Sequence, residues 1–351
     1  MVVLVLLFHV ESPKRDNLSI LAQIKRLDPI GIFFFIPSIV SLILALQWGG
    51  TAYSWSNPKI IGLLVTFAVL FVCFIVVEVL IPDTAMAPTR VILNRSMAGS
   101  MYFMFLISGS MMSTIYYLTI WFQAAKNTSA VRSGIDTLPI VLSFIIMGIL
   151  AAVLTQKIGY YVPSMLISVV LCSVGNGLLS TLSISSGKST WIGYQVLYGF
   201  GIGFGFQTSM LPPQNVLPRA DVPLGLALMF FMQQLGGSVF LSVSQNIFSS
   251  RLVHDLSGIA GLDAQTIVNT GATNLHSIVP ADELTTVLTA YNDALTRVFI
   301  LAASLSAFML LGALAIEWKK MGGDKQEDKE AVDEKPNGND ADGEDRGKKA
   351  L

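Results

Sequence analysis

Apolar stretches, each near the length that a helix needs to cross a membrane, follow one another along most of the chain. About 20 mainly apolar residues are required to span the hydrocarbon core of a bilayer. Eight stretches meet this condition, at roughly 30–47, 60–81, 98–121, 137–156, 162–182, 191–211, 224–248 and 296–316. Together they predict an all-α polytopic membrane protein with eight transmembrane helices.

The ends of the chain and one long connection do not fit a span. Residues 1–9 are apolar but too short to cross, and we interpret them as the end of a transmembrane helix followed by a linker, 10–29. Within 249–295, apolar residues recur at helical spacing after Pro280 and predict an amphipathic helix on the membrane surface. The tail 317–351 is polar and charged, which is typical of disorder.

Composition supports the membrane assignment and excludes several classes of protein. The chain of 351 residues is 53% apolar and only 13% charged. The tail holds 11 of the 23 acidic and 8 of the 22 basic residues, which leaves 12 acids and 14 basic residues in the other 316. So few charges cannot cover the surface of a soluble domain. The composition therefore excludes three classes of protein: a cytosolic enzyme, a secreted disulfide scaffold and a nucleic-acid-binding protein.

The distribution of basic residues predicts an orientation. An even number of spans places the linker 10–29 and the tail on one side. The short loops of that side, with Lys319 and Lys320 just past the last span, hold ten basic residues against six on the other side. Because basic residues concentrate in cytoplasmic loops, both ends are predicted to be cytoplasmic. The loops 122–136 and 249–295 would then face outward. Asn127-Thr128-Ser129 in the first of these loops is a candidate glycosylation site.

No pattern of residues predicts a metal or organic cofactor. The three histidines, His9, His254 and His276, have no partner at the spacing of metal ligands. No phosphate-binding glycine loop occurs, and no paired acids or serine–histidine pair lies within the spans. We therefore expect no cofactor and no enzymatic activity. The expected partners are the lipid bilayer, a small organic substrate and protons.

Polar residues inside the predicted spans are the candidates for a binding site, because placing them in lipid is costly. They are amides and tyrosines with almost no charge, which would suit a cavity for a neutral or amphiphilic solute. The alternative is that these side chains hydrogen-bond between helices and hold the bundle together. The candidates are Tyr116, Tyr117, Gln195, Gln207, Gln233 and Gln234.

Closely spaced glycines predict tight helix packing in two spans. In 191–211 the glycines form overlapping pairs four residues apart, a spacing that lets helix backbones approach closely in lipid. A further pair lies near the middle of 224–248. The packing candidates are Gly199, Gly201, Gly203, Gly205, Gly236 and Gly237.

Several short motifs resemble fungal fourteen-span drug–proton antiporters of the major facilitator superfamily (MFS), including exporters of mycotoxins and drugs. The similarity extends from residue 1 to about 320, and the motifs occur in the family's order. They are Leu27–Gly31, Leu44–Gly50, Tyr53–Trp55, Tyr116–Gln123, Ser133-Gly134, Leu138-Pro139, Lys157–Tyr161, Trp191–Gln195, Gly201–Gln207, Asp221–Pro223 and Leu235–Gly237.

The resemblance implies the C-terminal six-helix half of a transporter, 98–316, preceded by an extra helix pair, 30–81. The N-terminal half would be missing, so we expect that the chain alone does not carry out proton-coupled export from the plasma membrane. Glu78 is the one acid well inside a span; we expect it to reach the membrane interface, with a proton relay as the alternative. A nutrient or siderophore permease, or a half-transporter that regulates another protein, remain alternative functions.

Overall fold

The computed structural model describes residues 28–50, 52–81, 88–257, 267–268, 275, 279–280 and 283–321. Within these residues the regular elements are α-helices, joined by turns and one isolated bridge between Gly49 and Tyr53. The expectations for 1–9, for most of the linker 10–29 and for the tail beyond 321 lie outside the described residues. The all-α polytopic fold is confirmed.

Within the described residues there are eight long helices, and three short ones lie near their ends. The long helices are α3 (Pro29–Trp48), α4 (Pro58–Leu80), α6 (Arg95–Lys126), α8 (Leu138–Ile158), α9 (Val162–Leu179), α10 (Lys188–Thr208), α12 (Val222–Leu256) and α15 (Leu284–Ala315). The short ones are α5 (Thr89–Ile92), α7 (Ala130–Asp136) and α11 (Leu211–Val216).

Helix starts and stops follow local chemistry. Asn94 caps α6, and its side-chain oxygen accepts hydrogen bonds from the backbone of Ser96 and Met97, both at 3.1 Å. Prolines occupy the first turn of α3, α4, α8, α9 and α12, where the missing N–H would have no partner in any case. Gly159 ends α8 with a φ of 78°, a left-handed conformation that glycine adopts without strain.

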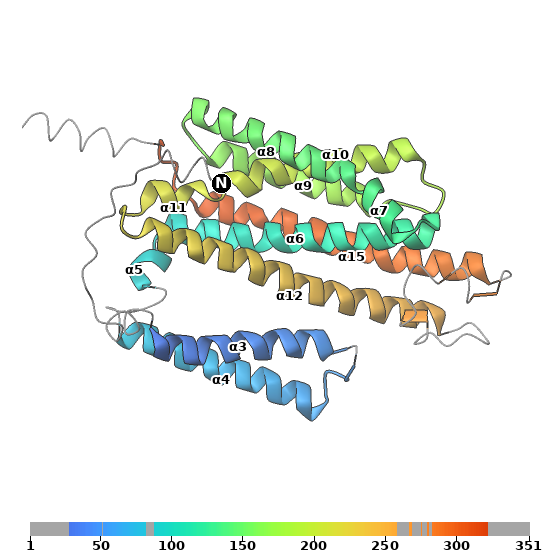
Figure 1. Cartoon of the computed structure of the whole chain (residues 1–351), viewed down its shortest axis with the longest axis horizontal. Helices are drawn as coiled ribbons and strands as arrows, with labels where there is room; N and C mark the ends of the chain where they lie inside the picture. The colour runs from blue at the N-terminus through green and yellow to red at the C-terminus, as the bar shows by residue number, and fades with distance from the viewer. Residues whose placement is uncertain are drawn as a thin grey trace, which may run out of the picture.

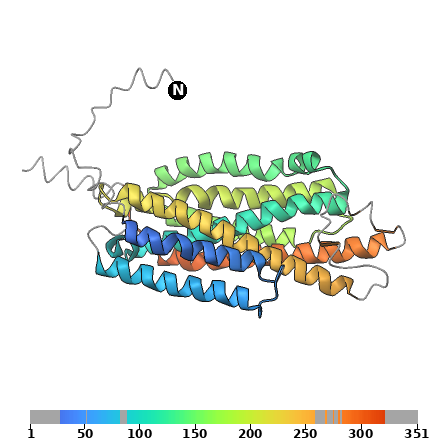
Figure 2. The same cartoon turned by 60° about the horizontal axis from the view of Figure 1, so that its bottom comes forward.

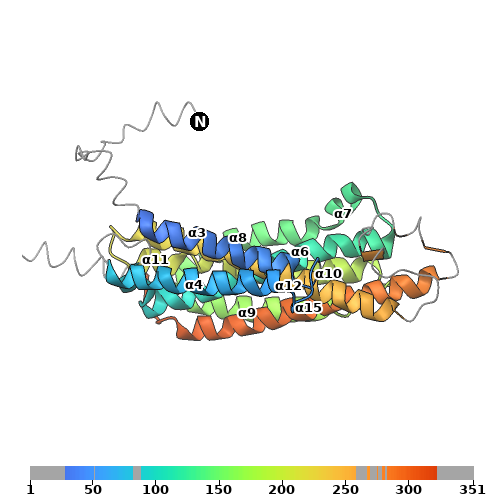
Figure 3. The same cartoon turned by 90° about the horizontal axis from the view of Figure 1, so that it is seen from below.

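The long helices run side by side along one axis (Figure 1). Six of them form a bundle in which α8 packs on α10, α10 on α9, α9 on α15, α15 on α6 and α6 on α12. The hairpin of α3 and α4 lies along the other side of α12, as Figures 2 and 3 show. The division into a six-helix transporter half and an extra helix pair stays a prediction.

Seven of the eight long helices are both long and apolar enough to cross a membrane, with α7 and α8 counted as one segment. The exception is α10, which has 21 residues but carries five glycines, Lys188 and two glutamines. It nevertheless packs along α8 and α9 within the bundle. Its low apolarity therefore reflects burial against other helices, and an eighth crossing remains our interpretation.

The predicted outer connection 249–295 differs from the structure at both ends. Helix α12 continues to Leu256, and α15 already begins at Leu284. We expected 284–295 to lie on the membrane surface, whereas Val287, Tyr291 and Leu295 are buried in the bundle as the first turns of α15. With 35 and 32 residues, α12 and α15 are about 50 Å long, well beyond the ~30 Å hydrocarbon core.

The hairpin of α3 and α4 contacts the bundle at two places along α12. The rings of Phe35 and Phe231 lie 5.1 Å apart. Nearer the other end, the Asn246 side-chain amide donates a 3.1 Å hydrogen bond to the carbonyl oxygen of Leu46. Gly50 has a φ of 77°, a left-handed conformation that favours glycine, and a Cβ there would lie 2.0 Å from the Asn246 side-chain oxygen. The hairpin is thus joined to α12 by specific contacts.

Glu78 differs from the sequence expectation of a solvated interfacial carboxylate. Its side chain is only 5% exposed. It shares the buried face of α4 with Phe74, one turn earlier, whose ring lies 4.7 Å from that of Phe35 on α3. Glu78 therefore lies on the buried face of α4, the face that carries the Phe74 contact with α3. A proton-relay role for it remains a proposal.

Labelling of single cysteines on either side of α12 tests the predicted orientation. Arg219 precedes α12 and Ser257 follows it, and both are exposed. In a chain without Cys73 and Cys172, a membrane-impermeant thiol reagent added outside should label Ser257→Cys and not Arg219→Cys. Leu256, the last residue of α12, is fully buried, so a cysteine at that position would not be accessible to the reagent. The reverse labelling pattern would invert the predicted orientation.

Candidate substrate-contact surface

Small residues form a close contact between α6 and α12. A Cβ on Gly236 would lie 2.0 Å from the carbonyl oxygen of Phe105, and one on Gly109 would lie 2.2 Å from the Phe240 ring. Beside them, the Ser108 hydroxyl donates a 2.6 Å hydrogen bond to the carbonyl oxygen of Gln233. Close backbone contact and interhelical hydrogen bonds of this kind drive helix association in lipid. This contact fixes the position of the adjacent side chains.

A pocket of about 110 Å³ lies beside this contact. The Gln233 side-chain oxygen is buried there and has no hydrogen-bond partner among the described residues, whereas Gln234 is exposed. A buried oxygen without a partner costs about 1–3 kcal/mol, so it is a candidate acceptor for a ligand. The pocket is lined by Ser108, Met111, Met112, Gln233, Gln234, Gly237, Ser238 and Leu241.

The two adjacent tyrosines of α6 have different surroundings. Tyr116 is 49% exposed and stands one helical turn beyond Met112 of the pocket, on the same face. Tyr117 is fully buried, and its hydroxyl donates a 2.8 Å hydrogen bond to the Gln245 side-chain oxygen on α12. Tyr116 is therefore available to a solute, whereas Tyr117 holds α6 and α12 together.

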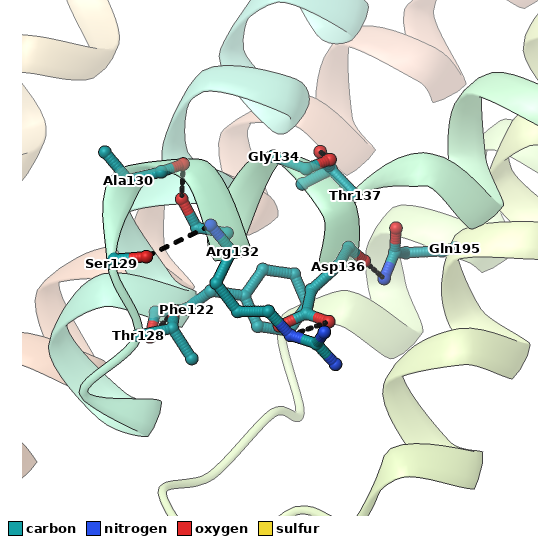
Figure 4. Close-up of polar contacts among 10 residues, drawn as sticks. Phe122, Thr128, Ser129, Ala130, Arg132, Gly134, Asp136, Thr137 and Gln195 are labelled. Carbon is teal, nitrogen blue, oxygen red and sulfur yellow. Dashed lines mark hydrogen bonds and ion pairs between the residues drawn. The ribbon is translucent and has the colours of Figure 1, made fainter.

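The two candidate glutamines of α10 lie away from the α6–α12 pocket. Gln195 is fully buried, and its side-chain amide donates a 3.0 Å hydrogen bond to the carbonyl oxygen of Asp136 at the end of α7 (Figure 4). This contact matches the helix-joining alternative more closely than a cavity role. Gln207 is exposed near the end of α10. Of the six candidates, Gln233 and Gln234 line the α6–α12 pocket, and Tyr116 stands one turn of α6 beyond it.

The glycines of α10 divide into two stripes that contact different helices. A Cβ on Gly199 or Gly203 would collide with α8, at 2.7 Å from the Ile140 carbonyl oxygen or 2.8 Å from that of Phe144. One on Gly201 or Gly205 would meet α9 instead. Gly237 is less crowded, since a Cβ there would lie 3.0 Å from Met112.

The predicted glycosylation site lies in the turn between α6 and α7. Asn127 is exposed and has a φ of 51°, a left-handed conformation that asparagine tolerates. The Ser129 hydroxyl accepts a 3.3 Å hydrogen bond from the backbone of Arg132 and caps α7 (Figure 4). The sequon is thus at the surface, and its modification stays a prediction.

A buried polar cluster at the centre of the bundle was not predicted from the sequence. The Asn176 amide of α9 donates to the Ser110 hydroxyl of α6 at 2.9 Å, and its oxygen accepts from Thr114 at 2.8 Å. Ser110 also lies 2.9 Å from the Tyr198 hydroxyl of α10 and 3.0 Å from that of Ser306 of α15. Four helices are joined at this point. The available signal was Asn176, the single asparagine of its span.

Titratable side chains do not gather into a metal site among the described residues. No group of three or more His, Cys, Asp and Glu side chains lies within reach of one ion there. His254 is exposed and lies 3.1 Å from the Asp255 carboxylate. Polar chemistry in the described bundle is therefore provided chiefly by hydroxyls and amides.

These features define the chain as an integral membrane protein of the polytopic α-helical class. Its sequence is 44% identical, over 93% of its length, to the MFS-type efflux pump MFS1 of Arthroderma benhamiae, 61% of which is covered. It is also 44% identical over 90% of its length to efflux pump aflT of Aspergillus parasiticus, covering 63%. The MFS-type transporter VdtG of Byssochlamys spectabilis is 40% identical, with 91% and 58% covered.

The chain belongs to the fungal family of MFS-type efflux transporters that these relatives represent. It spans about six-tenths of the length of the curated relatives it matches. No family model matches the chain. Family membership agrees with the resemblance inferred from the sequence motifs.

Proposed function

We propose that this chain forms part of a proton-driven exporter of small organic or amphiphilic compounds and that the α6–α12 pocket contacts the substrate. The observation that carries this proposal is the buried, unpartnered Gln233 oxygen in a pocket bordered by methionines and by Gln234. The efflux pumps among the relatives support the direction of transport. An amide acceptor beside flexible apolar side chains suits a neutral or weakly polar solute.

The size of the pocket limits its role. Its volume of about 110 Å³ is well below the 300–1,000 Å³ of sites that enclose a drug-sized ligand. The pocket therefore supplies one contact region on a larger surface that includes the exposed Tyr116 ring. In MFS transporters as a class, substrate lies near the midplane between two halves. We infer that this chain provides one of the two walls.

The membrane location and coupling ion are part of the same proposal. We place the transporter in the plasma membrane, with both ends of this chain in the cytoplasm. Protons are the proposed coupling ion, because the resemblance is to drug–proton antiporters. Glu78 is the intramembrane carboxylate to test, since it is buried on α4. We expect no gradient-driven transport by the 351-residue chain alone in vesicles.

Gln233→Leu tests the substrate contact in a chimera in which this chain replaces the matched residues of efflux pump aflT. The change should raise the half-saturating concentration of a fluorescent amphiphile by up to about tenfold, as expected for one lost hydrogen bond. Transport is measured as dye movement driven by an imposed proton gradient in vesicles. The thermal stability should not fall, because leucine removes a buried oxygen that has no partner.

Gln207→Leu is the matched control, since Gln207 lies on α10 and is exposed outside the pocket. It should leave the half-saturating concentration unchanged. Gln195→Leu should lower stability and change transport only through folding, because Gln195 is bonded to α7. A Gln233→Leu protein with unchanged transport and reduced stability would assign Gln233 to helix packing and refute the proposed contact.

A further inference from the structure

A second, larger concavity lies between α8 and α10 beside α7 and is separate from the α6–α12 pocket. It is a groove of about 630 Å³. One wall consists of α8 side chains four residues apart and the other of α10 side chains with the same spacing, so each wall is one helix face. These side chains are Leu138, Leu142 and Ile146 of α8 and Ile192, Val196 and Phe200 of α10.

Charged side chains gather at one end of the groove, where α7 and the start of α10 meet. Among the residues that the structure describes, Arg132 and Lys188 are the two cations that line it, and Asp136 is the one carboxylate. Arg132 contacts the Asp136 carboxylate at 3.3 Å, yet its side chain remains 56% exposed. Its guanidinium has five N–H donors, so a second acceptor can bind. Two cations against one acid leave this end positive.

The position of Asp136 is fixed from two directions, as Figure 4 shows. Its carboxylate receives Arg132, and its carbonyl oxygen accepts the Gln195 amide at 3.0 Å. The carboxylate is only 12% exposed, whereas the Arg132 side chain extends outward. The accessible charge at the end of the groove is therefore cationic.

The interior of the groove offers a solute almost no polar partner. Apart from the Trp191 indole, Ser143 is the one uncharged side chain with a polar atom among the described residues that line it. Its hydroxyl already contacts the carbonyl oxygens of Pro139 and Ile140. The α8 wall is uncovered, with Leu142 55% and Ile146 56% exposed. Apolar walls at membrane depth favour hydrocarbon over a solute that needs hydrogen bonds.

We propose that this groove binds one glycerophospholipid with an acidic headgroup. The headgroup phosphate would contact Arg132 and Lys188, and an acyl chain would lie between the apolar walls of α8 and α10. The cationic end of the groove matches the acidic headgroup of such a lipid, and the apolar walls match its acyl chain. Two accessible cations attract an acidic headgroup more strongly than a zwitterionic one. On the orientation predicted above, the groove would take this lipid from the outer leaflet.

Native mass spectrometry of the purified chain tests this proposal with phosphatidylglycerol and phosphatidylcholine of identical acyl chains. Phosphatidylglycerol should bind more tightly, and Arg132→Gln and Lys188→Gln should each weaken it by about fivefold. Phosphatidylcholine binding should change little. Lys157→Gln is the matched control, because Lys157 lies in the last turn of α8 and does not line the groove. Arg132→Lys should retain most of the binding.

A groove-filling substitution tests the acyl-chain contact separately. Ile146→Trp should reduce binding of both lipids, whereas Val170→Trp on the exposed face of α9 should leave it unchanged. Thermal unfolding without lipid establishes that each variant is folded. Equal binding of the two lipids, or phosphatidylglycerol binding that survives Ile146→Trp, would overturn the proposal. Displacement of phosphatidylglycerol by an exported dye would assign the groove to the substrate instead.

Discussion

Gly203→Leu is expected to destabilise the purified chain by about 2–3 kcal/mol, the upper range for overpacking a closely packed interface. A Cβ at this position would lie 2.8 Å from the Phe144 carbonyl oxygen and 2.9 Å from the Gly148 nitrogen, both in the backbone of α8. A backbone cannot move aside as a side-chain tip can. The leucine would therefore force α10 away from α8, and the midpoint of thermal unfolding should fall.

Gly193→Leu is the matched control, because Gly193 lies on the same helix and a Cβ there would meet nothing within 4 Å. It should leave the midpoint nearly unchanged. Comparing the two variants cancels the effect of replacing glycine by leucine in α10 itself. Equal stability of the two proteins would show that α8 and α10 do not pack closely at Gly203.

The glycine pattern shows which part of the packing a sequence can predict. Pairs of glycines four residues apart indicate a helix face that allows close contact. They do not say which neighbour makes the contact. In the structure Gly199 and Gly203 face α8, whereas Gly201 and Gly205 face α9. That division depends on how α10 is rotated about its own axis between α8 and α9. A short turn joins these two helices along the chain, so the sequence does not tell which of them each glycine faces.

The candidate glutamines and tyrosines show where sequence reasoning stops. Polarity within a span identified Tyr117 and Gln233 equally well, because both are costly in lipid. Their environments differ through the partners that the fold supplies. Tyr117 finds Gln245, 128 residues away along the chain, whereas the Gln233 oxygen has no partner among the described residues. Only the three-dimensional arrangement separates helix packing from a candidate binding role.

The ends of α12 and α15 show a different limit. Hydropathy detects the part of a helix that lies in hydrocarbon and is insensitive to the turns that extend beyond it. The sequence therefore predicts a surface helix over 284–295 that runs into the last span. Instead, Asn292 accepts a 2.9 Å hydrogen bond from the Trp121 indole and donates at 3.1 Å to the Leu182 carbonyl. These contacts, distant in sequence, keep the extension of α15 in the bundle.

Asn176→Leu is expected to destabilise the six-helix bundle by several kcal/mol, because it removes the centre of the buried polar cluster. Ser110 and Thr114 would each lose a hydrogen bond of 2.9 Å and 2.8 Å. Ser110 keeps its contacts with the Tyr198 and Ser306 hydroxyls. The buried Thr114 hydroxyl loses the acceptor of its hydrogen bond, which costs about 1–3 kcal/mol. The change should lower the midpoint of thermal unfolding, and hydrogen exchange should increase in α6, α9 and α15 together.

A double-mutant cycle with Thr114→Val separates this polar effect from a simple change of volume. Valine has nearly the shape of threonine but no hydroxyl, so Thr114→Val should partly relieve the cost of Asn176→Leu. The expected coupling free energy is about 1–2 kcal/mol, the scale of hydrogen bonds between helices in lipid. Ser304→Ala is the control, because Ser304 is exposed and bonded only to its own helix at 2.9 Å. Strictly additive effects of Asn176→Leu and Thr114→Val would contradict the hydrogen-bonded cluster, since independent sites show no coupling.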